Sequence, residues 1–266
     1  ATGDPLLVRA GRSLVPTPRA HELRERVSLL VQDAEAVLRP TEKLNLKQLD
    51  RTFTLRTSEG FVENFGAPLI ARIREEAPRV RLCFLQKPDK DSTALRSGIV
   101  DLETGVVEKT TAPELRVQAL FVDHYVGVVR TGHPLSKGKM TAARYAGGKH
   151  ISVSRQGLEK GPFDEVLETS GLQREVVVTV GGFSTALGLA RASDLLASVP
   201  ERHTGNLRAG MHTFPLPFSL PTFTVSMLWH PRLDADPAHR WLRGCVRDAC
   251  VESFADSSSK RKAAKS

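Results

Sequence analysis

The hydrophobic positions near the start of the chain change their spacing at residue 17. Residues 6–16, LLVRAGRSLVP, alternate apolar and basic side chains around Gly11, which predicts a short hairpin with an exposed tip. Thr17 and Pro18 then have the chemistry of a helix N-cap and a first helical residue. Apolar residues follow at three- and four-residue steps up to Pro40: Leu23, Val27, Leu30, Val31, Ala34 and Leu38. The sequence therefore predicts an amphipathic helix of about six turns. Its apolar stripe needs a partner, and a second copy of the chain is the simplest one.

From residue 51 the pattern becomes an alternation of strands and helices. Apolar or alternating stretches predict strands at residues 53–57, 80–85, 99–102, 125–129, 151–154, 176–180 and 222–229. Stretches with a helical period predict a helix through Phe61 and Ile73 that ends before Pro78, and a last helix that begins at Asp236-Pro237. Because helical crossovers usually join parallel strands, we expect an α/β fold in which strand, crossover and parallel strand repeat.

The composition of the 266 residues suits a globular protein, since 40% of them are hydrophobic and can fill a core. No run of about 18 apolar residues occurs, which excludes a membrane span. The first residues, ATGDPLLVRAGR, have no apolar stretch after a basic one, so no signal peptide is predicted. We therefore expect a cytoplasmic protein.

The net charge of +8 fits a protein that works near nucleic acid, although charge alone is a weak signal. Part of the excess lies in the last residues, DSSSKRKAAKS, which have nothing apolar to bury and are predicted to be disordered. The three cysteines, Cys83, Cys245 and Cys250, lie within apolar patterns and lack metal-ligand spacing. We expect them to be reduced core residues.

Several segments resemble one protein family. The first segment resembles the point in LysR-type transcriptional regulators where the wing of the winged helix-turn-helix runs into the linker helix, and it reads DPLLVRAGRSLVPTPRAHEL. Two further family segments are resembled by ALRSGIVDLETG and HYVGVVRTGHPL. The branch of the family that senses aromatic and related small molecules is resembled by DLLASVPERH and MLWHPRLDADPAHRWLR. Together these segments cover nearly the whole chain from Asp4 to Phe254.

The resemblance implies a periplasmic-binding-protein-like (type 2) effector domain of two α/β subdomains, joined by two crossing strands and preceded by a linker helix. It assigns residues 1–16 to a remnant of the wing, 17–40 to the linker and dimerisation helix, 51–125 with 219–256 to effector subdomain I, 126–218 to effector subdomain II, and 257–266 to the disordered basic tail. Only about sixteen residues precede the linker helix, so we expect most of the helix-turn-helix to be missing. Glu103-Thr104 stands where many relatives have small apolar residues, and we expect it to alter the cleft floor or the charge preference for the ligand.

The function implied is a homodimeric or homotetrameric regulator that senses a small effector, aromatic or carboxylated, between its subdomains. It would reach operator DNA through the complete protein. The alternative is a solute-binding protein of the same fold with no regulatory role. No catalytic motif is present, so we expect no enzyme activity and no cofactor.

Candidate effector contacts lie where strands run into helices, because ligands of open α/β sheets collect there and helix N-termini attract anions. Ser58, Glu59 and Gly60 follow the strand that ends at Thr57, and a plain helix cap is the alternative interpretation. In the second subdomain, Gly181-Gly182 lets the backbone approach closely before Ser184, although such a turn also simply reverses the chain. The complete predicted set is Thr57, Ser58, Glu59, Phe84, Gln86, Lys87, His150, Ser152, Phe183, Ser184, Thr185, Met227 and Leu228.

Several residues of this set also have a purely structural or solvent-exposed role as an alternative. Lys87 is a possible partner of an effector carboxylate or a merely solvated side chain, and His150 a possible ligand contact or a structural residue. Core packing is the expected alternative for Met227 and Leu228. A metal site at His230, Asp234, Asp236 and His239 is rejected, because Asp236 is better used as a helix N-cap.

Overall fold

The computed structural model describes residues 3–38, 44–86, 93–107, 111–154, 157 and 160–263. It divides the chain into two compact units, Ala1–Leu44 and Asn45–Ser266. Of the predicted contacts, Lys87 lies outside the described residues.

The first unit is the predicted hairpin and helix. Strands β1 (Leu7–Ala10) and β2 (Ser13–Pro16) pair antiparallel around Gly11, whose φ of +65° is the left-handed conformation that glycine adopts without strain. The Thr17 hydroxyl accepts a hydrogen bond from the Ala20 N–H and so caps α1 (Pro18–Leu38). Three apolar side chains of α1, Val27, Leu30 and Val31, are at least half exposed.

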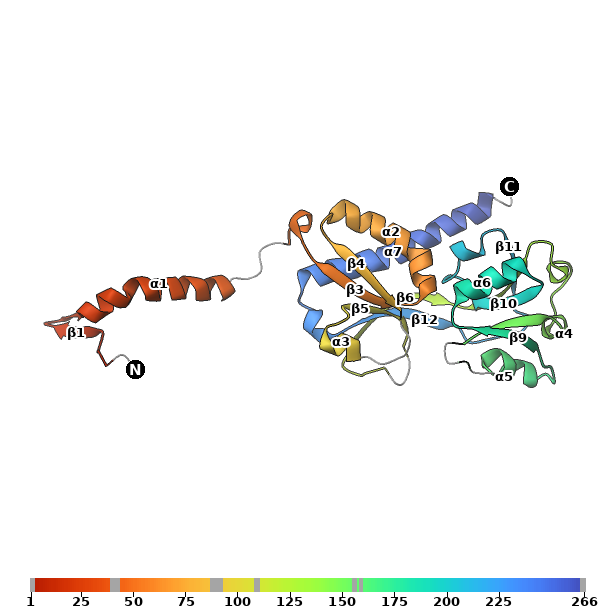
Figure 1. Cartoon of the computed structure of the whole chain (residues 1–266), viewed down its shortest axis with the longest axis horizontal. Helices are drawn as coiled ribbons and strands as arrows, with labels where there is room; N and C mark the ends of the chain where they lie inside the picture. The colour runs from red at the N-terminus through yellow and green to blue at the C-terminus, as the bar shows by residue number, and fades with distance from the viewer. Residues whose placement is uncertain are drawn as a thin grey trace. The chain divides into compact units, whose positions relative to one another are not determined.

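The second unit contains two five-stranded sheets, each of which forms the centre of a lobe (Figure 1). The sheet of the first lobe has the order β4-β3-β5-β12-β6, with β3 (Thr52–Thr57), β4 (Arg81–Gln86), β5 (Leu102–Val106), β6 (Arg116–Asp123) and β12 (Phe223–Trp229). The sheet of the second lobe has the order β11-β7-β10-β8-β9, with β7 (Tyr125–Arg130), β8 (Lys149–Val153), β9 (Glu175–Val180), β10 (Leu195–Pro200) and β11 (Met211–Pro215).

Helices cover both faces of each sheet. The first lobe carries α2 (Glu59–Glu76), α3 (Thr93–Ser97) and α7 (Pro237–Ala263), and the second carries α4 (Ala142–Ala146), α5 (Pro162–Glu168) and α6 (Phe183–Ala192). Short 3-10 turns lie at Leu46–Gln48, Pro134–Ser136, Asn206–Arg208 and Pro231–Leu233. The chain crosses between the lobes twice, from β6 directly into β7 and from β11 into β12.

The buried side chains follow the predicted periodicities. Phe61, Phe65, Leu69 and Ile73 recur along one face of α2 and are buried. In the second lobe, Ala186, Leu187 and Ala190 of α6 pack on one face of the sheet, while Tyr145 and Leu167 belong to a separate cluster with Leu196 and Phe214. Each lobe therefore has its own apolar core.

Some expectations about the strands were wrong. The strand placed at residues 99–102 is β5, at Leu102–Val106, and β6, β10 and β11 were missed. The expected parallel repetition is incomplete, because β12 pairs antiparallel with β5 and β6, and β7 pairs antiparallel with β10 and β11. A chain that crosses between two sheets and returns must reverse its direction in both, and this produces the antiparallel pairs.

The C-terminal segment also differs from expectation. Asp236 accepts the N–H groups of Ala238 and His239, which is the predicted cap. The helix then runs through Ala263, so most of the segment 257–266 continues α7. Cys245 and Cys250 are buried thiols, and burial raises the pKa of each to about 12, while Cys83 is half-buried.

Candidate functional site

The first element of the candidate site is the start of α2. Thr57 ends β3 fully buried, and the next residue, Ser58, is the N-cap of α2, whose hydroxyl accepts the Phe61 N–H at 3.3 Å. Glu59 lies in the first turn, where the helix dipole favours a negative charge. Gln86, the last residue of the neighbouring strand, donates its amide to Glu59 Oε1 at 2.6 Å. Four predicted contact residues therefore lie together at the carboxyl ends of β3 and β4.

The second element is the loop that follows β10 in the other lobe. The carboxylate of Asp123, at the first crossing, accepts the N–H groups of Arg202 and His203, each at 2.9 Å. The buried Arg208 guanidinium donates to the Glu201 carbonyl at 2.6 Å and to two threonine hydroxyls, which holds the same loop from the other side. Charge-assisted bonds of this kind give the loop a defined shape, and they fix the position of His203.

Ser58 and His203 meet between the lobes. The Ser58 Oγ lies 2.5 Å from His203 Nε2. The imidazole ring packs beside Phe61 and Phe121, with centroids 6.2 and 6.3 Å away. His203 is 8% exposed and Ser58 is half-buried, so this hydrogen bond is partly shielded from solvent.

Further polar contacts continue along α2. The Asn64 amide donates to the Arg202 carbonyl at 3.0 Å, and Asn64 Oδ1 accepts the Asn206 N–H at 3.0 Å. The Ser184 hydroxyl donates to the Glu63 carboxylate. Together with the Ser58–His203 pair, these bonds form the inter-lobe contact between α2 and residues 182–206.

Two glycines allow this close approach. A Cβ atom added at Gly60 would lie 2.9 Å from His203 Cδ2 and 3.2 Å from the His203 carbonyl oxygen, and one added at Gly182 would lie 2.6 Å from Glu59 Oε2. Neither position tolerates a side chain without movement of its neighbour. The glycines that the sequence pattern singled out at 181–182 therefore serve, at Gly182, the approach of the two lobes.

Aromatic side chains gather at the crossing strands. The Tyr125 ring contacts Phe163 edge-on at 5.0 Å and Phe223 at 5.3 Å, so it links α5 with the first residue of β12. The Arg174 guanidinium lies over the Phe163 ring at 5.2 Å. Burial raises the pKa of the Tyr125 phenol, so this hydroxyl stays protonated at neutral pH.

The unusual Glu103 has a partner inside the first lobe. Its carboxylate accepts from Arg56 Nε at 2.7 Å and lies 2.5 Å from Arg56 Nη2, and both side chains are buried. The two residues are adjacent in the parallel pair of β3 and β5. The extra negative charge is therefore neutralised by Arg56.

The other predicted contacts are scattered. His150 is fully buried and donates from Nε2 to the Tyr145 carbonyl at 2.8 Å. Its ring packs at a tilt against the Tyr145 ring, with centroids 4.7 Å apart, so both are the contacts of a core residue. Met227 and Leu228 are also core residues. Phe84 and Ser152 are half-buried strand positions, Phe183 packs against the core of the second lobe, and Thr185 is exposed.

The rejected metal ligands are all engaged in other contacts. Asp234 accepts the Trp229 indole N–H at 2.6 Å and pairs with Arg116, while His230 caps a 3-10 turn. His239 Nε2 lies 3.0 Å from the Asp101 carbonyl oxygen. Over the residues that the structure describes, no group of three or more His, Cys, Asp or Glu side chains could hold a metal ion.

Sequence reasoning missed His203, Glu63, Asn64 and Asp123. Each owes its position to partners more than 75 residues away in the chain, so no local pattern marks it. The adjacent polar pair Glu63-Asn64, next to the apolar stripe of a predicted helix, was the one available signal.

Comparison with known proteins gives a consistent result. Residues 47–251 match the family model described as LysR substrate binding domain. The chain is 28% identical over 251 residues to the HTH-type transcriptional activator NagR of Ralstonia sp, covering 91% of this chain and 81% of the relative. It is 28% identical over 248 residues to the HTH-type transcriptional activator NahR of Pseudomonas putida, and the match covers 92% of this chain and 82% of the relative.

Solved structures agree in fold. A probable transcriptional regulator from Pseudomonas aeruginosa superposes with a TM-score of 0.68 at 29% identity, covering 91% of this chain and 82% of that chain. The regulatory domain of MexT, a transcriptional activator in the same species, superposes with a TM-score of 0.63 at 25% sequence identity. The match covers 76% of this chain and 98% of that chain. The predicted two-lobed α/β fold is confirmed. Within the described residues, no helix combines the length and hydropathy needed to cross a bilayer.

Proposed function

The chain belongs to the family of LysR substrate-binding domains, and on that premise we propose that it senses a small effector between its two lobes for a transcriptional regulator. The observation that carries the proposal is the inter-lobe contact. Ser58 of the first lobe hydrogen-bonds to His203 of the second, and Ser184 of the second lobe hydrogen-bonds to Glu63 of the first. A ligand that touches both lobes can favour one of their relative orientations, and it does so by its difference in affinity for the two.

An aromatic or carboxylated effector suits the chemistry around this contact. The rings of Tyr125, Phe163 and Phe223 supply apolar surface near the crossings. Once the Glu59 and Glu63 carboxylates are displaced, the N-termini of α2 and α6 supply positive dipole ends for an anion. The side chains of Ser58, His203 and Ser184 would then set the orientation of the ligand. We propose that no metal or cofactor takes part and that the protein is not an enzyme.

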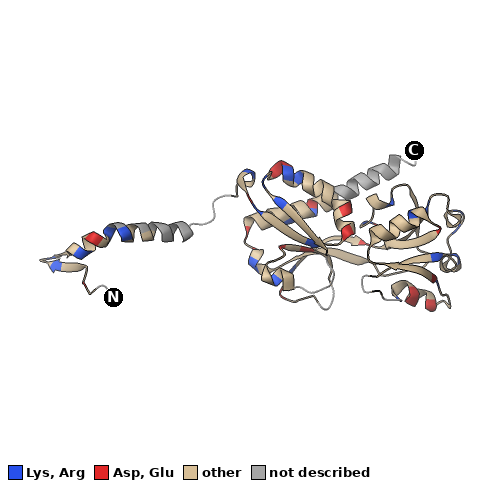
Figure 2. Ribbon diagram, viewed as in Figure 1, with Lys and Arg blue, Asp and Glu red and all other residues tan. Residues whose placement is uncertain are grey.

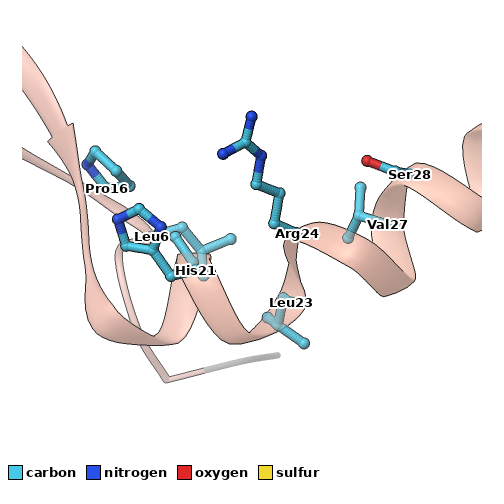
Figure 3. A pocket seen from close by; sticks show the side chains of 8 residues that line it. Leu6, Pro16, His21, Leu23, Arg24, Val27 and Ser28 are labelled. Atoms are coloured by element: carbon cyan, nitrogen blue, oxygen red, sulfur yellow. The ribbon is translucent and has the colours of Figure 1, made fainter.

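The partners follow from the first unit. Leu6, Pro16, Ala20, Leu23 and Val27 border an open apolar groove of about 390 Å³ beside the start of α1 (Figure 3). We propose that α1 pairs with a second copy of the chain, in a dimer or tetramer, and that operator DNA is contacted only through the complete protein, in the cytoplasm. The relatives are regulators, which favours this function over a solute-binding protein of the same fold.

A thermal-shift screen of aromatic acids tests the sensing role. A ligand at 100 times its Kd stabilises the folded chain by about 2.7 kcal/mol. We expect Ser58→Ala and Ser184→Ala to weaken the affinity of a hit by up to about fivefold each, the equivalent of about one hydrogen bond to the ligand. This loss exceeds the gain from no longer breaking the inter-lobe contact of the same hydroxyl. Ser170→Ala is the matched control, because Ser170 is exposed at the end of α5.

The comparison uses the ligand-induced shift in each variant, since Ser58→Ala also removes a helix cap. If Ser58→Ala and Ser184→Ala both bind every hit as tightly as Ser170→Ala does, the effector does not lie between these lobes.

A further inference from the structure

Helix α2 has a second face besides the one that it buries in its own lobe. Gly60, Glu63 and Asn64 lie beside the apolar stripe and contact the second lobe. Asn64 is 5% exposed although it is polar, and its amide donates to the Arg202 carbonyl and accepts the Asn206 N–H. A buried polar network of this kind specifies one arrangement of the elements that it joins.

Of the two acidic residues of this face, Glu59 lies in the first turn, where the dipole of α2 favours it, but Glu63 adds a second negative charge close by. Glu59 and Glu63 are four residues apart, and like charges at this spacing repel. Figure 2 shows acidic positions at the end of α2 that lies near the second lobe. Among the residues that the structure describes, neither carboxylate forms an ion pair; their contacts are the Gln86 amide, the Ser184 hydroxyl and the close approach to Gly182.

These contacts place both carboxylates at the N-terminus of α6. That helix has ten residues, and its cap, Gly182, makes no side-chain cap hydrogen bond. Carboxylates beside the first turn compensate the positive end of the helix dipole, as a capping side chain would. While the lobes are together, these contacts therefore offset the repulsion within α2.

We propose that α2 is an intramolecular latch, in which Glu59 and Glu63 occupy the N-terminus of α6 and, with Ser58 and Asn64, hold the lobes in a resting orientation. The inference rests on the proposed function in one respect. The Ser58 and Ser184 hydroxyls that would bind an effector are already engaged across the lobes. An effector must therefore displace the latch, so binding and lobe rearrangement are coupled.

The latch is tested first without any ligand. Fluorescent labels are attached through non-natural amino acids at Ser97 in α3 and Ser170 after α5, both exposed and in different lobes. The wild-type chain should give one narrow distribution of the efficiency of fluorescence energy transfer between the two labels. Glu63→Ala should broaden it or add a second population, whereas Glu75→Ala, at an exposed position near the other end of the same helix, should not.

A second variant disturbs the contact between α2 and His203 by adding bulk. Gly60→Ala places a methyl group against the His203 ring and backbone and should shift the distribution in the same way. Gly188→Ala in α6 is its control, because a Cβ there meets nothing within 4 Å. If Glu63→Ala and Gly60→Ala both melt cooperatively and keep the wild-type distribution, there is no latch.

A second measurement uses benzoate as the probe. Glu63→Ala should tighten the apparent Kd for benzoate by about threefold or more, because less free energy is spent on opening the latch. Unchanged or weaker binding by this variant would overturn the coupling. If benzoate binds to none of the variants, the proposed ligand class is wrong, and the ligand-free distributions still decide whether the latch exists.

Discussion

A short polar side chain can cap a helix through hydrogen bonds that are local in the sequence. Thr17, Ser58 and Asp236 are helix caps in the structure because an N-cap needs only a short polar side chain and the following N–H groups. His203 was not predictable, since it reaches Ser58 only through the fold of both lobes and the bonds from Asp123 and Arg208 to its loop. The same holds for the pairing of Glu103 with Arg56.

His150 shows how a residue predicted as a candidate ligand contact can affect stability instead. Burial lowers its pKa from 6.5 to about 4. The folded chain therefore keeps the imidazole neutral while the unfolded chain takes up a proton below pH 6.5. The stability due to this histidine is complete above that pH and is lost as the pH falls toward 4. His239, whose pKa is also lowered by burial, acts in the same direction.

We expect the free energy of unfolding to fall steeply between pH 6.5 and pH 4, with ~3 kcal/mol of the loss due to His150. Urea titrations at several pH values measure it. His150→Gln retains a donor for the Tyr145 carbonyl but does not titrate, so its pH dependence should be shallower by that amount. Ser170→Ala, at an exposed position after α5, should leave the slope unchanged. Parallel curves for wild type and His150→Gln would show that the imidazole is not buried as described.

At the scale of elements, the long helices and the strands with helical crossovers were predicted well, and the strands near the crossings were not. The strand at β10 has the sequence LLASVP and follows α6 after only two residues, so its apolar run merges with the helical pattern. The edge strands β6 and β11 are set by their antiparallel partners in other parts of the chain. Register with a distant strand leaves no local signal.

The pairing of β7 with β11 gives a prediction at this scale. Gly127 lies opposite Phe214, and a Cβ at residue 127 would be 2.2 Å from the Phe214 ring. We expect Gly127→Ala to lower the free energy of unfolding by ~2 kcal/mol, because the ring must move within a packed core. Gly181→Ala, where a Cβ meets nothing within 4 Å, is the control.

Chemical denaturation of Gly127→Ala and of the double variant Gly127→Ala with Phe214→Leu measures this effect. The smaller leucine should recover part of the loss. Equal stability of Gly127→Ala and Gly181→Ala would mean that β7 and β11 do not pair in this register.

At the scale of the whole molecule, hydrophobic periodicity predicted a separate amphipathic helix followed by an α/β part. The two lobes and their two crossings were predicted from the resemblance to the family. The contact between the lobes could not be predicted, since it is polar and leaves no periodic trace. The apolar stripe of α1 has the opposite character: it is visible in the sequence, and its members Val27, Leu30 and Val31 are exposed in the single chain.

Exposed apolar side chains at helical spacing favour self-association, because pairing two such helices removes both stripes from water. We expect the wild-type chain to dimerise at micromolar concentration and Leu30→Lys to raise the dimer Kd at least tenfold, since a lysine at the centre of the stripe would bury its charge. Glu22→Lys, which adds a lysine on α1 outside the stripe, should dimerise as the wild type does. Sedimentation velocity over a concentration series separates these cases. A Leu30→Lys chain that dimerises like Glu22→Lys would place the dimer interface elsewhere, and the stripe would then need a different partner.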